Sequence, residues 1–438
     1  MAPTGTMGII LPLLILQAGN ATWISFLLTL TAFSLVLYCI HRFARHCASA
    51  GALATFAEVG LGRKAGMIAG WAYVVAMLFG VAGAAPSAAY YANVFLTQVT
   101  GTPGTFVRGA LLTALVVGVA WLVAHRDIKL STKVMLAIEF SSLAVMIAIV
   151  GMAMVHSGAW VDRPQLRFGG ANLSGFQFAM IFGFMTLAGF ESVTALGEEA
   201  SHATRTIPRV IVSCLLPIGL LYLVVIYCLV SLGHKYGMAL EQMEVPFEAI
   251  SRRMGYGMLG EASSIGIALS YFACTLGSLN AGARVLYSMA HKGEFAAQFG
   301  KVHPENATPH RAIALISAIG IAAPLALLGL KVTLLDCVNY LTQMASFGFI
   351  GAYFLVCLAL PFYLRKRGIL RTADAVISAM AMVILGAVLG FSVFPVPPTP
   401  LRYLPYIFVL MMLAGVGISL GYLRKGDFGA GRENRSPG

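Results

Sequence analysis

The chain has 438 residues, of which 59% are hydrophobic and only 11% are charged. A soluble globular domain carries about 25% charged residues, so this composition excludes one and indicates a polytopic membrane protein. The formal net charge of +12 does not indicate a nucleic-acid partner, because the basic residues lie in short loops between apolar segments, where they report orientation instead.

The chain begins with residues 1–8, which contain proline, threonine and glycine and lead into an apolar segment of half the usual length at 7–16. No basic stretch comes first, so a signal peptide is not predicted. This pattern is typical of the centre of a discontinuous membrane helix, and we expect the first half of that helix to be missing. The alternative is a flexible N-terminus or an ordinary helix cap, because Gly and Pro also occur in continuous membrane helices. The candidate binding residues here are Pro3, Thr4, Gly5 and Thr6.

Eleven later segments are apolar over the roughly 20 residues that a helix needs to cross the hydrocarbon core. They lie at 23–43, 65–94, 107–124, 134–155, 176–196, 211–232, 265–290, 312–330, 338–363, 375–394 and 404–420. With the partial segment they predict one membrane domain over residues 1–423 and a tail at 424–438. Most of the 29 lysines and arginines then lie in loops on the side of both termini. We therefore expect a multi-pass plasma-membrane protein with both ends in the cytoplasm.

The sixth segment is broken by Thr186-Leu187-Ala188-Gly189-Phe190-Glu191, which places a glycine and a carboxylate deep inside a membrane span. A charge there costs about 2.5–3.5 kcal/mol on insertion scales, so such an acid usually faces protein or a water-filled cavity and belongs to a transport path. Close helix packing through small residues is the alternative for the residues before it. The candidate binding residues are Thr186, Ala188, Gly189 and Phe190.

Glu191 has two interpretations that the sequence leaves open. Burial favours the neutral form of a carboxyl group, so Glu191 is a candidate to bind a proton and to couple protonation to movement of a gate. Alternatively, its side chain forms hydrogen bonds with the backbone groups that the helix break sets free.

Interruptions at corresponding places in two halves of an apolar chain indicate a secondary transporter built from inverted repeats. Lipid cannot satisfy free backbone groups, so an unwound stretch persists only where it is buried or lines a cavity. We expect free N–H groups at Thr4–Thr6 to bind a substrate carboxylate. Free carbonyl groups near Thr186 are expected to bind its ammonium group, so that the two breaks together recognise the main chain of an α-amino acid.

Other charged residues have structural interpretations. Glu139, in the fifth segment, lies within about two turns of Lys133 and is expected to extend toward the cytoplasmic face. A mixed-charge cluster at the inner end of the sixth segment forms a solvated loop or an ion pair at an inner gate, and it consists of Glu198, Glu199, Arg205 and Arg209.

Three sets of motifs carry a family resemblance. The first is Gly189-Phe190-Glu191 with the acidic pair 198–199 and the sequence Arg-Thr-Ile-Pro-Arg at 205–209. The second is Ser-Leu-Asn-Ala-Gly-Ala-Arg-Val-Leu-Tyr at 278–287 followed by Thr-Pro-His-Arg-Ala-Ile at 308–313. The third is Ala-Gly at 50–51, Gly-Leu-Gly at 60–62 and Gly-Trp at 70–71. In this order and spacing, the chain resembles the amino acid–polyamine–organocation (APC) superfamily of permeases over nearly its whole length.

The resemblance implies an all-α, LeuT-like five-plus-five inverted repeat, roughly 1–156 and 174–364, with two additional helices. It also implies a substrate near the bilayer midplane and alternating access. We expect a secondary transporter of an amino acid or related amine, coupled to protons or working by exchange. A membrane nutrient sensor that uses the same scaffold without transport is the alternative. The sequence predicts no oligomeric state.

No feature of the sequence indicates catalysis, a cofactor or a resident metal. The chain contains no phosphate-binding loop for ATP-driven pumping, no HExxH motif and no intramembrane nucleophile with a positioned base. Its seven cysteines form no CxxC pair. Sodium coupling would need convergent oxygen ligands, and the nearby hydroxyl groups, Thr275 and Ser278, are more typical of hydrogen bonds between helices.

Overall fold

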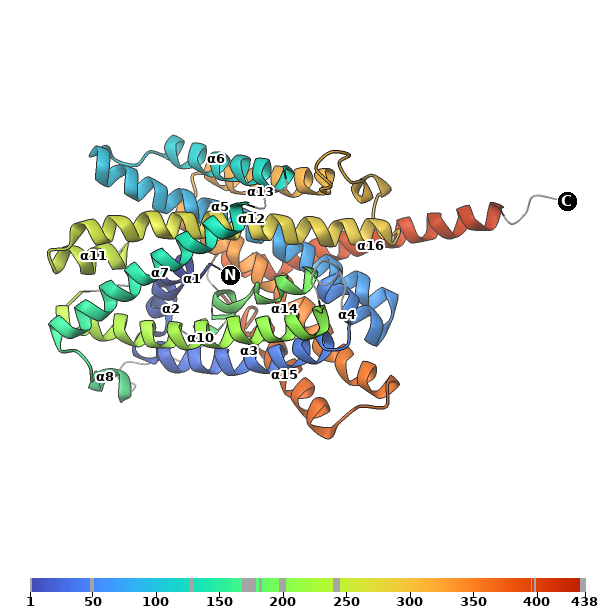
Figure 1. Ribbon diagram of the computed structural model, residues 1–438, viewed down its shortest axis with the longest axis horizontal. Coiled ribbons are helices and arrows are strands. Elements are labelled where there is room, and N and C mark those ends of the chain that lie inside the picture. Colours follow the sequence, from blue (N-terminus) through green and yellow to red (C-terminus); the bar gives the residue numbers. More distant parts are fainter. Residues whose placement is uncertain are drawn as a thin grey trace.

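A computed structural model describes residues 2–47, 51–126, 130–167, 179–180, 183–196, 202–238, 245–394, 396–397 and 399–433. Every regular element in these ranges is helical, and ten helices are long and apolar enough to cross a membrane. The all-α polytopic fold is therefore confirmed. Figure 1 shows these helices lying side by side, most of them along the longest axis of the molecule.

The ten long helices overlap the predicted segments one for one. They are α3 (Thr22–Ala44), α5 (Arg63–Thr100), α6 (Phe106–His125), α7 (Leu130–Ser157), α10 (Ala203–Tyr236), α12 (Gly257–His291), α13 (His310–Gly329), α14 (Leu334–Lys366), α15 (Thr372–Phe391) and α16 (Leu404–Glu433). The remaining predicted segment, the sixth at 176–196, lies partly outside the described residues. In Figure 1 the last part of α16 extends beyond the bundle, so this helix continues past the expected boundary at 423.

Shorter elements connect or interrupt the long ones. They are α1 (Pro3–Gly8), α2 (Ile10–Ala18), η1 (Gly19–Ala21), α4 (Ala52–Leu61), α8 (Arg163–Leu166), η2 (Phe190–Leu196), α11 (Pro246–Arg253), η4 (Ala297–Gly300) and η5 (Leu401–Tyr403). The pair α1 and α2 forms the half-length apolar segment that the sequence predicts at the N-terminus.

Helix α5 is the centre of the bundle. It packs most extensively against α12 and α14 and also contacts α4, α6 and α13. Almost every residue from Gly66 to Ala89 is buried, as expected for a helix that is apolar on all sides and surrounded by others. The outer helices instead expose large apolar side chains such as Leu220 on α10, Val383 on α15 and Leu410 on α16, and these faces are suited to contact lipid.

Small residues allow the central helices to approach closely. A Cβ atom at Gly348 of α14 would lie 2.6 Å from the carbonyl oxygen of Ala72 and 2.6 Å from the backbone nitrogen of Ala76, both on α5. Such contacts with backbone atoms cannot be relieved by a change of rotamer. Small residues at these positions are typical of membrane helix interfaces, where close van der Waals packing replaces the hydrophobic driving force.

We expect Gly348→Ala to separate α14 from α5 and to lower stability by about 1–3 kcal/mol, the usual cost of overpacking. Thermal unfolding in detergent measures the effect. The matched control is Gly386→Ala on α15, where an added Cβ meets no atom within 4 Å. Equal melting temperatures for the two variants would contradict the close-packing interpretation.

Candidate functional site

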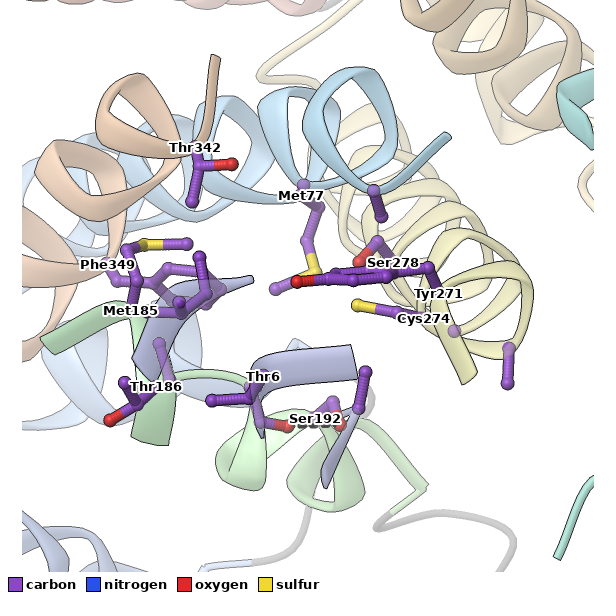
Figure 2. A pocket seen from close by; sticks show the side chains of 18 residues that line it. Thr6, Met77, Met185, Thr186, Ser192, Tyr271, Cys274, Ser278, Thr342 and Phe349 are labelled. Carbon is purple, nitrogen blue, oxygen red and sulfur yellow. Dashed lines mark hydrogen bonds between the residues drawn. The ribbon is translucent and has the colours of Figure 1, made fainter. Parts of the chain in front are cut away.

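An internal cavity of about 190 Å³ lies among α1, α2, α5, the sixth segment, α12 and α14. Figure 2 shows side chains from these elements converging on it, with Tyr271 and Cys274 on one side and Met185 and Phe349 on the other. Two helix breaks, one in the first segment and one in the sixth, adjoin this cavity.

The first break lies at Ile9, between α1 and α2. Tyr91 donates a hydrogen bond of 2.6 Å from its hydroxyl group to the carbonyl oxygen of Gly8, which satisfies an acceptor at the end of α1. The sequence predicts that the outer half of the first helix begins around Thr4–Thr6, and α1 begins close by, at Pro3. Residues 3–8 are helical because Pro3 occupies the first helical position, where its fixed φ is favourable, and Thr6 N–H bonds to the Ala2 carbonyl at 2.8 Å.

The N–H groups expected to be free at the start of α1 have side-chain partners. Thr4 donates from its backbone nitrogen (2.9 Å) and from its hydroxyl group (3.1 Å) to Glu139 Oε1 of α7. Gly5 N–H donates to Ser270 Oγ of α12 at 3.2 Å. Glu139 therefore points toward α1, and the expectation that it extends to the aqueous face is wrong. A carboxylate is favoured there by the unsatisfied N–H groups and by the positive end of the helix dipole.

The second break lies where the sequence predicts it. Residues 183–187 are helical, Ala188 and Gly189 form a turn, and η2 follows from Phe190. Gly189 has a φ of +95°, which is accessible to glycine and strained for other residues. The Ser192 N–H and hydroxyl groups both bond to the Gly189 carbonyl, at 3.3 and 2.7 Å, so the turn satisfies part of its own backbone.

Glu191 is fully buried and connects this turn to α14. Its Oε2 atom accepts hydrogen bonds from Gly189 N–H at 3.0 Å and from the Tyr353 hydroxyl group at 2.5 Å. Its Oε1 atom is buried and has no hydrogen-bond partner among the described residues, and no described cation pairs with the carboxyl group. The carboxyl group lies beside an aromatic cluster of Phe33, Phe190 and Tyr353, whose ring centroids are 5.9–6.2 Å apart.

Half of the predicted binding residues lie at the cavity. Those that line it are Thr6, Thr186, Ala188 and Gly189. Those that are not part of its wall are Pro3, Thr4, Gly5 and Phe190. Gly5 packs against the ring of Tyr271, which does line the cavity, and Phe190 belongs to the aromatic cluster. Contact with a substrate stays a prediction for all eight.

Much of the cavity wall comes from residues that the sequence did not single out. They lie on continuous helices and include Met77 and Gly80 of α5, Tyr271, Cys274 and Gly277 of α12, and Thr342 and Phe349 of α14. Ser278 also lines the cavity, whereas the Thr275 hydroxyl group bonds to the Tyr271 carbonyl at 2.9 Å. No break or charge marks these positions, so only the packing of α5, α12 and α14 reveals them.

The cavity is uncharged. None of the described residues that line it is Asp, Glu, Lys, Arg or His; hydroxyl groups, thioethers, a thiol and a phenyl ring form its surface beside small residues. The Tyr271 hydroxyl group is buried and completes no hydrogen bond with the described residues. Figure 2 shows it directed toward the middle of the cavity. A buried polar group without a partner is unfavourable, so this hydroxyl group is suited to bond with a ligand.

An all-helical membrane bundle with two interrupted segments beside a cavity is the architecture typical of membrane proteins with discontinuous helices. Within that class, the family model described as Amino acid permease matches residues 3–397. The chain therefore belongs to the amino acid permease family, and the resemblance to the APC superfamily is confirmed.

Individual relatives are distant. The uncharacterized amino acid permease YecA of Bacillus subtilis is 24% identical over 64% of this chain and 63% of its own length. The vacuolar cationic amino acid transporter 4 of Arabidopsis thaliana is 26% identical over 81% of this chain and 59% of its own. The branched-chain amino acid permease BcaP of Lactococcus lactis is 25% identical over 80% and 76%. The chain thus spans about three fifths of the length of the first two relatives.

Two glycines of the cavity wall should respond differently to an added methyl group. We expect Gly189→Ala to lower stability by about 1–3 kcal/mol, because alanine is strained at positive φ. Gly277→Ala should preserve or raise stability, since alanine is favoured in a helix by about 0.8–1.0 kcal/mol and the added atom meets nothing within 4 Å. Thermal unfolding of both purified variants tests this, and a more stable Gly189→Ala protein would contradict the assigned turn.

Proposed function

We propose that the protein is a secondary transporter that moves an α-amino acid with an uncharged, largely apolar side chain by alternating access. The observation that carries the proposal is the uncharged cavity of about 190 Å³ at two helix breaks. Family membership supports amino acid transport as the activity. The charge of the preferred substrate follows from the cavity lining and not from the relatives, whose names include both cationic and branched-chain substrates.

The size of the cavity favours a small ligand, since drug-sized ligands occupy pockets of roughly 300–1,000 Å³. Met77, Met185 and Phe349 offer apolar surface to a side chain. A cationic side chain would instead need a carboxylate in the wall, because burying an unpaired charge is unfavourable. Glu191 is not one of the residues that line the cavity, and its Oε2 atom already accepts hydrogen bonds from Gly189 N–H and Tyr353.

For the substrate main chain, we assign the ammonium group to the turn formed by Thr186, Ala188 and Gly189. The carboxylate is assigned to hydroxyl donors of the cavity wall, with Thr6 and Tyr271 as the principal pair. The first N–H groups of α1 already bond to Glu139 and Ser270. Pro3, Thr4 and Gly5 are therefore proposed to act by positioning α1, and Phe190 by supporting Glu191.

Glu191 combines both roles that the sequence left open. Its two hydrogen bonds through Oε2 support a structural role at the break. Its unbonded Oε1 and the absence of a paired cation among the described residues support proton binding, because an isolated buried carboxylate is unfavourable when charged. A proton that binds here changes the charge of the group that links the sixth segment to α14, which supports proton coupling.

We further propose that the protein lies in the plasma membrane with both termini in the cytoplasm. The proposal rests on the distribution of lysine and arginine between alternate loops.

Uptake into proteoliposomes tests the transport proposal. We expect accumulation of leucine, valine and alanine, no competition by lysine, and a selective effect of Gly277→Ala. The added methyl group should raise the KM for leucine about tenfold and change that for alanine little, since one methylene in an apolar pocket is worth about 1–3 kcal/mol. Gly118→Ala on α6, also in open space, is the control. Leucine binding without flux would favour the nutrient sensor, and lysine uptake would refute the uncharged substrate.

Replacement of Glu191 tests the proton role. Glu191→Gln keeps acceptors for Gly189 N–H and Tyr353 but cannot ionise, so we expect substrate exchange to persist while accumulation driven by a pH gradient is lost. Counterflow and pH-jump uptake in proteoliposomes measure the two activities, and Glu305→Gln, in an exposed loop, is the control. Unchanged pH-driven accumulation in Glu191→Gln would remove the proton role and leave the structural one.

A further inference from the structure

A second hollow, of about 510 Å³, lies on the outside of the bundle between α3, α10 and the start of α15. We call it the α3–α10 groove. Its arginines are Arg42 of α3, Arg45 just after α3 and Arg371 just before α15, and His41 also lines it. Its apolar residues include Leu37 and Leu216. Figure 1 shows α3, α10 and α15 on the same side of the bundle.

The groove carries excess positive charge. Arg42 forms a two-point ion pair with the buried Asp374, in which Nε and Nη2 each lie 3.0 Å from a carboxylate oxygen. The side chains of Arg45 and Arg371 are exposed and form no ion pair within the described part of the chain. Arg42 is neutralised by Asp374, so two guanidinium groups line the groove without an ion-pair partner among the residues that the structure describes.

The helix dipoles favour the positions of two of these three arginines but not of the third. Arg42 and Arg45 lie at the C-terminal end of α3, where a cation is favourable. Arg371 is at the N-cap of α15, where a cation is unfavourable. An anion bound between Arg45 and Arg371 would offset this cost. Because the two arginines lie at the ends of membrane spans, that anion would lie at the level of the lipid headgroups.

The apolar side of the groove continues along α10. Leu216, Leu220 and Val224 are 37%, 58% and 59% exposed and repeat every four residues, so they form one stripe on the outer face of the helix. At 1.5 Å per residue the stripe is about 12 Å long. It begins beside the arginines and runs away from them into the membrane. The arginines at one end and the apolar stripe beyond them match the charged headgroup and the acyl chain of a lipid.

We propose that the α3–α10 groove binds an anionic phospholipid. Arg45 and Arg371 contact its phosphate group, which suits the planar, multidentate guanidinium group. One acyl chain lies along Leu216, Leu220 and Val224. Basic pockets between membrane helices on the cytoplasmic side are typical headgroup sites, and the orientation proposed above puts the groove on that side.

The lipid would connect α15 to the substrate site through α3. Arg45 ends the helix that carries Phe33, and Phe33 contacts both Phe190 and Tyr353 beside Glu191. A phosphate group shared by Arg45 and Arg371 would therefore connect α3 and α15 at a second point beside the Arg42–Asp374 ion pair, with an effect on the stability of the whole protein.

Native mass spectrometry and thermal unfolding of the detergent-purified full chain test the proposal. The probes are phosphatidylglycerol, phosphatidylcholine and inorganic phosphate. We expect phosphatidylglycerol to bind and to raise the melting temperature, with at least about tenfold weaker binding in Arg45→Gln/Arg371→Gln.

Arg126→Gln/Arg311→Gln is the matched control, because it also removes two exposed arginines at ends of membrane spans. Leu216→Gln, which keeps every arginine, should weaken phosphatidylglycerol binding as well. If the double variant does not fold, this single variant tests whether lipid binds in the groove.

Equal loss of phosphatidylglycerol binding in the two double variants would refute a defined site and indicate general attraction of lipid to basic surfaces. Equal binding of phosphatidylcholine would refute selection for an anionic lipid. Stabilisation by inorganic phosphate alone, with no effect of Leu216→Gln on lipid binding, would assign the groove to a soluble anion.

Discussion

The structure depends on one constraint: a backbone group inside a membrane needs a partner wherever its helix is interrupted. In the described part of the chain, side chains bond to backbone groups at both interruptions, from other helices at the first and from the same segment at the second. Tyr91 bonds to the carbonyl at the end of α1, Glu139 and Ser270 bond to N–H groups at its start, and Glu191 bonds to the N–H of Gly189. The irregular backbone at the cavity is therefore fixed by α5, α7 and α12 as much as by its own sequence.

The same contacts connect the cavity to the rest of the bundle. Glu191 and Tyr353 join the sixth segment to α14, and Phe33 adds α3 to this group. Because α14 also packs closely against α5 through Gly348, the break is connected by direct contacts to the central helix of the bundle. A cavity wall attached in this way is suited to move as a unit with its helices.

Local signals were enough to predict the fold and the second break. Apolar runs of about 20 residues identify membrane helices without tertiary information, and Gly189 beside Glu191 is conspicuous in an apolar span. The start of α1 at Pro3 lies close to the predicted Thr4–Thr6. The irregularity at Ile9 was not predicted, because proline and glycine are compatible with both a helix start and an interruption. The direction of Glu139 and the roles of Tyr271 and Gly277 could not be predicted, since they depend on which helices become neighbours.

The open space beside Gly277 has an evolutionary consequence. An added Cβ atom there meets no atom within 4 Å, so the volume of the cavity at this point is set by a side chain that the packing of the helices does not require. A substitution at this one position would therefore change the volume of the cavity between related permeases while every helix interface stays unchanged.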